Sequence, residues 1–273
     1  MEILIESRSV ATITADLLLI GLFADSSSLT PGAAAVDTAS GGAIQRVLSL
    51  GDFRGQANET AFLYPERGSN ARIGLVGLGP EAALTPAALQ NALAEAPRRA
   101  AAFGGRRVAA MGVEAAALGD FGEALGYAAV AGPFDPGKSK PGEEPVQTIV
   151  VPGVAAGEAE ALWAAVAEGV VIGRAVNDAR HLVYLPPNVL TPTALAEAAQ
   201  KLAAECGLSS DVWDGDRLQA EGMTALLAVA RGSSQPPRLV MLKYTAPGAK
   251  ATLALVGKGV TFDAGGLGLK DTP

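Results

Sequence analysis

The sequence predicts an α/β fold with a largely parallel sheet, followed by the start of a second α/β domain. Apolar runs alternate with helix-like stretches over the first 150 residues or so, as expected for strands joined by crossover helices. The chain has 273 residues, of which 49% are hydrophobic and 18% charged, so it can bury one or two cores. The runs expected to form buried strands are 16–23, 71–79, 106–113 and 147–153.

Two helices are expected between these strands, at 41–50 and 85–103. The second begins with Thr85 and Pro86, an N-cap residue followed by a proline at the first helical position. Residues 132–145 are rich in proline, glycine and charge, which predicts a surface loop.

A long helix is expected after the strand at 147–153. Leu162, Val166 and Val170 fall on one helical face, while acidic residues gather at the start and arginines near the end, which suits the helix dipole. We expect this helix, residues 154–180, to link two domains.

A second α/β domain is predicted from residue 181 onward. Pro186 and Pro187 force an extended segment, because a residue before proline avoids the helical region. Thr191 and Pro192 then start a helix that Gly207 ends. The further elements expected are a helix at 222–233 and strands at 238–246 and 251–259, separated by a turn at Pro247 and Gly248.

Composition excludes several classes of protein. The net charge of −7 argues against a protein that binds nucleic acid by electrostatics, and we interpret the four arginines within 97–107 as a helix end and solvated loop. The single cysteine, Cys206, rules out an internal disulfide and fits a reducing compartment. The apolar run at 17–23 is too short to cross a bilayer, and no basic segment precedes it. We therefore expect a cytoplasmic protein with no membrane segment.

The candidate site is the glycine-rich stretch VGKGVTFDAGGLGLK at 256–270, which carries Lys258, Asp263 and Lys270. It follows a predicted strand, where ligands sit in α/β sheets, and its glycines let a backbone approach a ligand closely. It has neither the P-loop spacing nor the dinucleotide-binding pattern. From the residues alone, an anion- or metal-binding loop and a solvated glycine-rich turn are equal alternatives.

The same fifteen residues resemble the signature of the leucyl aminopeptidase (cytosol aminopeptidase) family, V-G-K-G-[IV]-T-F-D-[ST]-G-G-x-x-[IL]-K. Residues 179–197 and 222–244 resemble the segments that precede this signature, and 16–23, 41–60 and 72–79 resemble the N-terminal domain of the family. The resemblance implies a macro-domain-like N-terminal domain at 1–153, a linker helix at 154–180, and the beginning of a metallo-aminopeptidase catalytic domain at 181–273.

The resemblance also implies roles for three residues. Lys258 would bind a metal ion through its neutral amine, Asp263 would bridge two metal ions, and Lys270 would stay protonated and stabilise the oxyanion formed from the scissile carbonyl. The cofactors would be two divalent ions per subunit, Mn²⁺ or Zn²⁺, which activate a water molecule. The substrates would be peptides that lose their N-terminal residue, and the full-length protein would be a homohexamer.

The sequence departs from the family pattern in places. Ala264 stands where the family has Ser or Thr, and His181 and Tyr184 stand where it has Asp and Asn. We interpret His181, the only histidine, as a packing or surface residue rather than a ligand.

The other family ligands, an Asp and an N-T-D-A-E-G-R segment, have no counterpart in the 273 residues. Two ligands cannot hold two ions that need about four positions each. We therefore expect this chain to be an inactive N-terminal fragment. The alternative is a non-catalytic binding or regulatory paralogue, including one that binds DNA, although the acidic balance weighs against nucleic acid as a partner.

Overall fold

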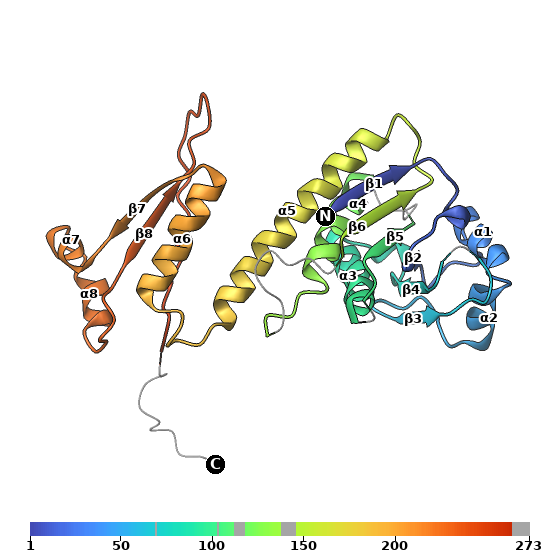
Figure 1. Cartoon of the computed structure of the whole chain (residues 1–273), viewed down its shortest axis with the longest axis horizontal. Coiled ribbons are helices and arrows are strands. Elements are labelled where there is room, and N and C mark those ends of the chain that lie inside the picture. Colours follow the sequence, from blue (N-terminus) through green and yellow to red (C-terminus); the bar gives the residue numbers. More distant parts are fainter. Residues whose placement is uncertain (69, 103, 112–117, 138–145, 264–273) are drawn as a thin grey trace, which may run out of the picture. The chain divides into compact units, whose positions relative to one another are not determined.

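A computed structural model describes the chain except for residues 69, 103, 112–117, 138–145 and 264–273. The chain divides into two compact units, Met1–His181 and Leu182–Pro273. The elements are labelled in Figure 1.

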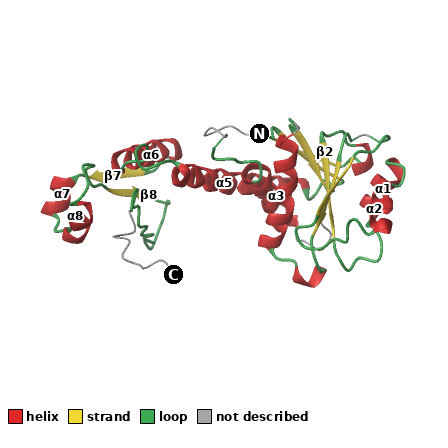
Figure 2. Cartoon of the chain, turned by 90° about the horizontal axis from the view of Figure 1, so that it is seen from below, coloured by secondary structure: helices red, strands yellow, loops and turns green. Residues whose placement is uncertain are grey.

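The first unit contains a six-stranded sheet with helices on both faces (Figures 1 and 2). The strand order is β1-β6-β5-β2-β4-β3, and every neighbouring pair is parallel except β3 with β4. The predicted α/β class with a largely parallel sheet is therefore confirmed. The strands are β1 (Glu2–Glu6), β2 (Leu17–Leu22), β3 (Thr60–Leu63), β4 (Ile73–Gly77), β5 (Arg107–Ala110) and β6 (Thr148–Pro152).

The strand β2 shows why these apolar runs form a central sheet. Leu17 and Leu19 pack into the core on one face, and Leu18 and Ile20 pack into the core on the other. A strand covered on both faces gives a continuous apolar run rather than an alternating one. The predicted strands at 16–23, 71–79, 106–113 and 147–153 are confirmed as β2, β4, β5 and β6.

The helices divide between the two faces of this sheet. Residues from α3, α4 and α5 line one core, and residues from α1 and α2 line the other. The helices predicted at 41–50 and 85–103 are confirmed as α2 and α3, whereas α1 and α4 were not predicted. The helices are α1 (Pro31–Ala39), α2 (Ala43–Leu50), α3 (Pro86–Ala102), α4 (Leu118–Ala131) and α5 (Ala159–Tyr184), with short 3₁₀ turns η1 (Val10–Thr12) and η2 (Glu81–Ala83).

The helices α4 and α5 touch through their backbones. A Cβ atom on Gly126 of α4 would lie 2.0 Å from the carbonyl oxygen of Val166, and one on Gly169 of α5 would lie 2.0 Å from that of Glu123. Only glycine allows such an approach. The long predicted helix is therefore present and runs from Ala159 to Tyr184; its residues up to His181 belong to the first unit, where they pack along α4.

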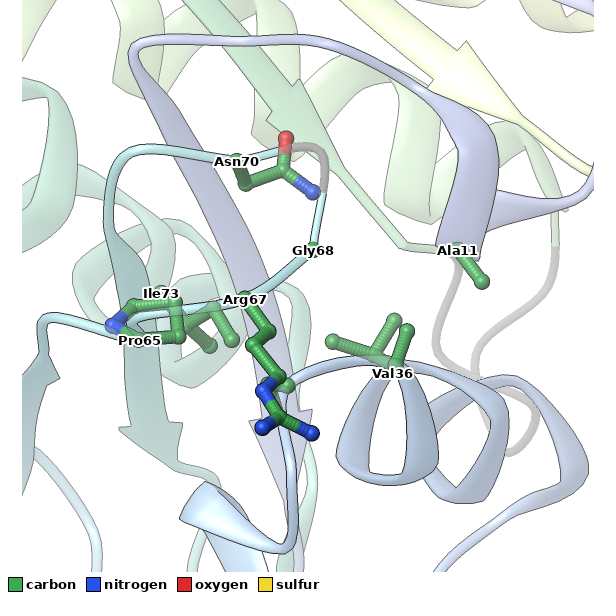
Figure 3. Close-up of a pocket in the computed structure, with 9 residues that line it drawn as sticks. Ala11, Val36, Pro65, Arg67, Gly68, Asn70 and Ile73 are labelled. Carbon is green, nitrogen blue, oxygen red and sulfur yellow. The ribbon is translucent and has the colours of Figure 1, made fainter.

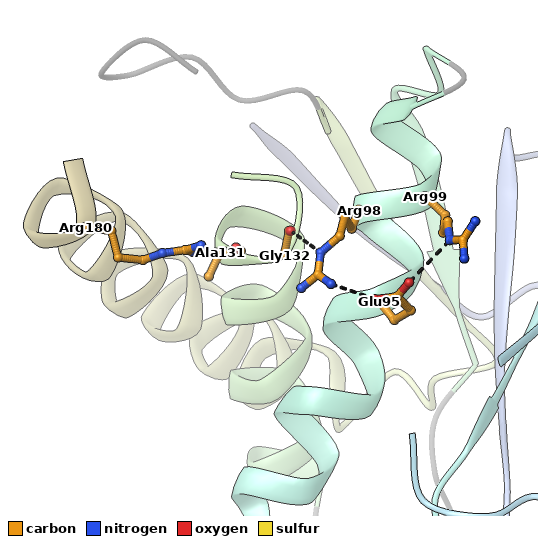
Figure 4. A network of polar contacts seen from close by, with 6 residues as sticks. All are labelled: Glu95, Arg98, Arg99, Ala131, Gly132 and Arg180. Carbon is orange, nitrogen blue, oxygen red and sulfur yellow. Dashed lines mark hydrogen bonds and ion pairs between the residues drawn. The ribbon is translucent and has the colours of Figure 1, made fainter. Parts of the chain in front are cut away.

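Side chains from α3 and α5 bind the last two carbonyl groups of α4 and that of Gly132, which follows it (Figure 4). The carbonyl of Val130 accepts a hydrogen bond from Asn177 (3.0 Å), that of Ala131 from Arg180 (3.0 Å), and that of Gly132 from Arg98 (3.2 Å). The last carbonyls of a helix have no partner within the helix, so these bonds satisfy groups that would otherwise be unpaired.

The second unit contains a helix packed on a two-stranded antiparallel sheet. Its helix α6 begins as predicted: the side chain of Thr191 accepts a hydrogen bond from the backbone N–H of Ala194 (3.2 Å), and Gly207 ends the helix with a φ of 67°. The predicted helix at 222–233 and strand at 238–246 are confirmed in shorter form. The elements are α6 (Pro192–Cys206), β7 (Ser209–Trp213), α7 (Gly215–Ala220), α8 (Thr224–Ala230) and β8 (Leu239–Lys243).

The predicted strand at 251–259 is wrong. These residues form no strand, and Leu253, Leu255 and Val256 are 84%, 90% and 97% exposed. An apolar run forms a strand only where a neighbouring strand accepts its hydrogen bonds. Within the described part of the second unit, β8 pairs with β7 alone.

Candidate active-site segment

The residues predicted to carry chemistry lie on the segment that follows β8. The chain turns at 246–249, where the N–H of Ala249 donates to the carbonyl of Ala246 (3.2 Å) and Gly248 has a φ of 72°. Lys258 and Asp263 follow and are both exposed. Lys270 and Ala264 lie outside the described residues. The structure therefore places two of the three predicted residues on one accessible segment.

The start of α6 lies against this segment. A Cβ atom on Gly259 would be 3.5 Å from Cδ2 of Leu195, which is an ordinary van der Waals contact. The N–H of Leu195 donates to the carbonyl of Thr191 (2.9 Å), so this leucine belongs to the first turn that the N-cap stabilises. The cap at Thr191 therefore fixes the helix turn that Gly259 contacts.

The described residues supply part of a metal-binding donor set. The carboxylate of Asp263 can bridge two cations, and the amine of Lys258 can donate a lone pair when it is not protonated. Each ion needs about four positions. Across the described ranges, no three His, Cys, Asp or Glu residues lie close enough together to hold a metal ion. These two residues alone do not make a metal site.

The one histidine does not add to this set. Nδ1 of His181 is buried and has no hydrogen-bond partner among the described residues. A single ring nitrogen on α5, outside any group of ligands, fits the predicted role in packing rather than in metal binding.

The carboxyl ends of β2 and β4, an edge of the kind where α/β sheets usually bind ligands, are covered by the chain itself. A Cβ atom on Gly77 would lie 1.9 Å from the carbonyl oxygen of Gln56, and one on Gly55 would lie 2.8 Å from that of Phe23. The N–H of Gly79 also donates to the carbonyl of Gly55 (2.9 Å). The backbone of the loop at 53–58 therefore packs directly against the ends of β2 and β4.

A small cavity of about 10 Å³, little more than the space of one water molecule, lies beside α1 in the first unit (Figure 3). Arg67 and Asn70 are among the polar residues that line it. Oδ1 of the buried Asn70 accepts a hydrogen bond from the N–H of Ala15 (3.1 Å), so this group holds the loop before β2 in place. None of the residues predicted to carry chemistry lines this cavity. Its walls are formed by Ala11, Val36, Ala39, Ser40, Pro65, Arg67, Gly68, Asn70 and Ile73.

A structural rather than a functional role also fits Asp16. The backbone N–H of Arg107 lowers the pKa of this carboxyl, the N–H of Arg106 and the nearby charge of Arg72 act in the same direction, and partial burial opposes them. Oδ2 accepts both N–H bonds, at 2.9 Å from Arg107 and 2.8 Å from Arg106. This carboxylate thus ties the start of β2 to the start of β5.

Two models of one protein family match the chain. Residues 19–131 match the N-terminal domain of the cytosol aminopeptidase family, and residues 177–273 match its catalytic domain. The chain belongs to the cytosol aminopeptidase family. The signature residues 256–270 lie within the part that matches the catalytic domain.

Individual proteins agree with this family. A "probable cytosol aminopeptidase" of Acidobacterium capsulatum is 37% identical over 244 residues, covering 86% of this chain and 48% of the relative. A mutant of tomato leucine aminopeptidase has a similar structure, with a TM-score of 0.84, 25% identity, and coverage of 97% of this chain and 55% of that protein. The bottromycin maturation enzyme BotP in complex with Mn has a TM-score of 0.64 at 28% identity, covering 86% of this chain and 46% of that protein.

The chain spans about half the length of the cytosol aminopeptidases that it matches. Family membership therefore concerns the fold of both units, and the individual roles of Lys258, Asp263 and Lys270 remain predictions. Within the described residues, no helix has both the length and the apolar character needed to cross a membrane.

Proposed function

We propose that this sequence forms the N-terminal domain and the first part of the catalytic domain of a metal-dependent leucyl aminopeptidase. The whole enzyme would release the N-terminal amino acid from peptides. The observation that supports this most strongly is the fifteen-residue signature at 256–270 within a segment that matches the catalytic domain of the family.

Three residues carry this proposal. Lys258 and Asp263 bind the metal ions, and Lys270 keeps its proton and donates it in a hydrogen bond to the oxygen of the scissile carbonyl. A pair of Mn²⁺ or Zn²⁺ ions, when bound, supplies an activated water molecule and polarises that carbonyl. The exposure of Lys258 and Asp263 supports the proposal, since both side chains are open to solutes.

Peptidase activity would require more metal ligands than this chain provides. Lys258 and Asp263 provide two ligands, whereas two ions need about four positions each. We therefore propose that the 273 residues have no peptidase activity alone and that the missing ligands belong to a longer polypeptide. A homohexameric assembly and a cytoplasmic location are further parts of the proposal, and both rest on the family alone.

The test compares this chain with the product of the whole reading frame. Hydrolysis of Leu-p-nitroanilide with Mn²⁺ is expected from the longer product and not from the 273-residue chain. In the longer product, Lys258→Ala and Asp263→Asn should abolish activity and reduce the manganese that remains bound after dialysis. Lys270→Ala should abolish activity while the manganese content is kept.

Lys250 provides the matched control, because it is an exposed lysine eight residues before Lys258 on the same segment. The Lys250→Ala variant should keep both activity and metal content. Wild-type activity in Lys258→Ala and Asp263→Asn would refute the assigned roles. A longer product that binds no manganese and cleaves no peptide would instead support a non-catalytic protein.

A further inference from the structure

The segment that carries Lys258 meets the helix α6 directly after that lysine. The described residues 250–263 are all exposed except Thr261, which is half-buried. Two residues before this threonine, a Cβ atom on Gly259 would lie 3.5 Å from Cδ2 of Leu195 in α6. The contact between the segment and α6 is therefore centred on residues 259–261.

The helix α6 gives this contact a rigid support. It packs on β7 and β8, and its Ala196 and Ala203, which lie seven residues apart on one side, are buried. Its first turn is capped by the side chain of Thr191, and the N–H of Leu195 donates to the carbonyl of the same threonine (2.9 Å). A capped first turn is held in helical form, so the position of Leu195 is fixed relative to the sheet.

A second leucine of α6 shows what the segment adds. Leu195 and Leu202 stand one residue before the buried Ala196 and Ala203, so the two leucines flank the buried side in the same way. Leu202 is 42% exposed, whereas Leu195 is half-buried. The passage of the segment at Gly259 beside the first turn of α6 agrees with this difference.

We propose that Leu195 is a positioning residue for Lys258. Its contact with Gly259 holds the backbone next to the lysine against α6 and so limits the region that the amine can reach. A lysine side chain has many rotamers, and a ligand group that is ordered before the ion binds loses less entropy on binding. This inference rests on the proposed function, because it concerns the affinity of Lys258 for a metal ion.

Disulfide trapping in the 273-residue chain tests the contact without any metal ion. The exposed Cys206 is the only cysteine, so Cys206→Ser is the background. A cysteine fits at position 259, because a Cβ atom there lies at an ordinary contact distance from the side chain of Leu195. Mild oxidation of a dilute sample of Leu195→Cys with Gly259→Cys should therefore join the two thiols within one chain.

Leu202→Cys with Gly259→Cys is the matched control for this experiment. Position 202 lies about 10 Å further along α6, beyond the reach of a disulfide, so the bond should form at least about tenfold more slowly. Titration of the free thiols in the monomer measures both rates. Equal rates for the two pairs would overturn the proposal, because the segment would then have no fixed place on α6.

The affinity of the longer gene product for manganese tests the positioning itself. Loss of a group that orients a metal ligand costs about 10–100-fold in metal affinity, and a single apolar contact belongs at the low end, so equilibrium dialysis should show about tenfold weaker binding in Leu195→Ala. Leu195→Met keeps a long apolar side chain and should retain the wild-type affinity. Leu202→Ala should retain it as well.

Two results of the dialysis would overturn the proposal. One is an unchanged affinity in Leu195→Ala. The other is an equal loss in Leu195→Ala and Leu202→Ala, because it would reflect a general loosening of α6 rather than the contact with Gly259.

The Lys258→Ala variant separates this proposal from the proposed function. If Lys258→Ala weakens manganese binding and Leu195→Ala does not, the positioning role alone is wrong. If Lys258→Ala binds manganese as the wild type does, the assigned metal ligand is wrong, and the positioning role is wrong with it even where the disulfide forms.

Discussion

Replacement of Gly126 by alanine is expected to destabilise the first unit, although alanine is the better helix former. In the native packing, the added Cβ atom would lie 2.0 Å from the carbonyl oxygen of Val166 and 2.9 Å from the backbone nitrogen of Val170. Real Cβ atoms essentially never come within 3.0 Å of a neighbouring atom, so α4 and α5 must separate by about 1 Å. Both obstructing atoms belong to the backbone, so a change of side-chain rotamer cannot relieve the contact.

The expected magnitude follows from two opposing terms. Overpacking a core typically costs 1–3 kcal/mol, and a clash with rigid backbone belongs at the upper end, about 3 kcal/mol. Alanine in a helix interior recovers about 1 kcal/mol relative to glycine. The net loss should be about 2 kcal/mol. For a unit of this size, about 2–4 °C is lost per kcal/mol, so the melting temperature should fall by about 4–8 °C.

The assay is thermal unfolding followed by circular dichroism, with Gly119→Ala as the control. Gly119 also lies in α4, but a Cβ atom there would meet nothing within 4 Å. That variant should be neutral or more stable by up to about 1 kcal/mol. The two substitutions are chemically identical, but Gly119 lies in the first turn of α4 without a neighbour, whereas Gly126 lies in the interior of α4 against α5. Equal shifts in melting temperature for the two variants would refute the backbone contact between α4 and α5.

Four further outcomes are expected. Asp16→Ala should cost about 1 kcal/mol at pH 7, because the carboxylate accepts two backbone N–H bonds. Folding lowers the pKa of Asp16, so the contribution of this carboxylate to the free energy of unfolding is fully present above the ordinary carboxyl pKa and is lost as the pH falls through the folded pKa. Urea unfolding of the wild type and of Asp16→Ala from pH 7 to pH 2 should show that the difference in unfolding free energy vanishes. A difference that stays constant with pH would contradict this. Asp37→Ala should cost about 1–2 kcal/mol in urea unfolding, because Oδ1 accepts the N–H groups of Ile44 and Gln45 at the start of α2, where the N-cap residue Gly42 has no side chain to do so. Arg180→Ala should cost about 1 kcal/mol by the same measurement, because it leaves the carbonyl of Ala131 at the end of α4 without its donor, and an unchanged midpoint would show that water replaces that donor. Limited proteolysis with chymotrypsin should cut first in 251–263, after Leu255 or Phe262, and a first cut within α3 would show that this segment is protected.

The parts of the fold that could be predicted are those whose signal is local. β2 is an apolar run buried on both faces, and α6 has an N-cap threonine and a terminal glycine in the left-handed conformation. The helix α4 was missed because its glycines lower helix propensity. The stabilisation that offsets this low propensity comes from packing against α3 and α5, which only the tertiary structure reveals.

The prediction of a strand at 251–259 was wrong for the opposite reason. Its apolar run has the same local signal as β2, but a strand also depends on a neighbour, and sequence does not show whether one is present. The prediction of the candidate site was limited in the same way. The positions of Lys258 and Asp263 after a predicted strand left a ligand-binding loop and a solvated turn as equal alternatives, and only the fifteen-residue signature pointed to metal ions and peptides. The described structure places both side chains on one exposed segment, and the metal ions proposed for them would need donors from elsewhere.

The loop at 53–58 limits which mutations could create a binding site in the first unit. A single substitution in this loop changes only a side chain. The backbone of Gly55 and Gln56 would still cover the ends of β2 and β4. A binding site directly over the ends of β2 and β4 would first require a deletion that shortens the loop. Such a deletion would also remove the partner of the Gly79 amide, so any gain of affinity would begin with a loss of stability.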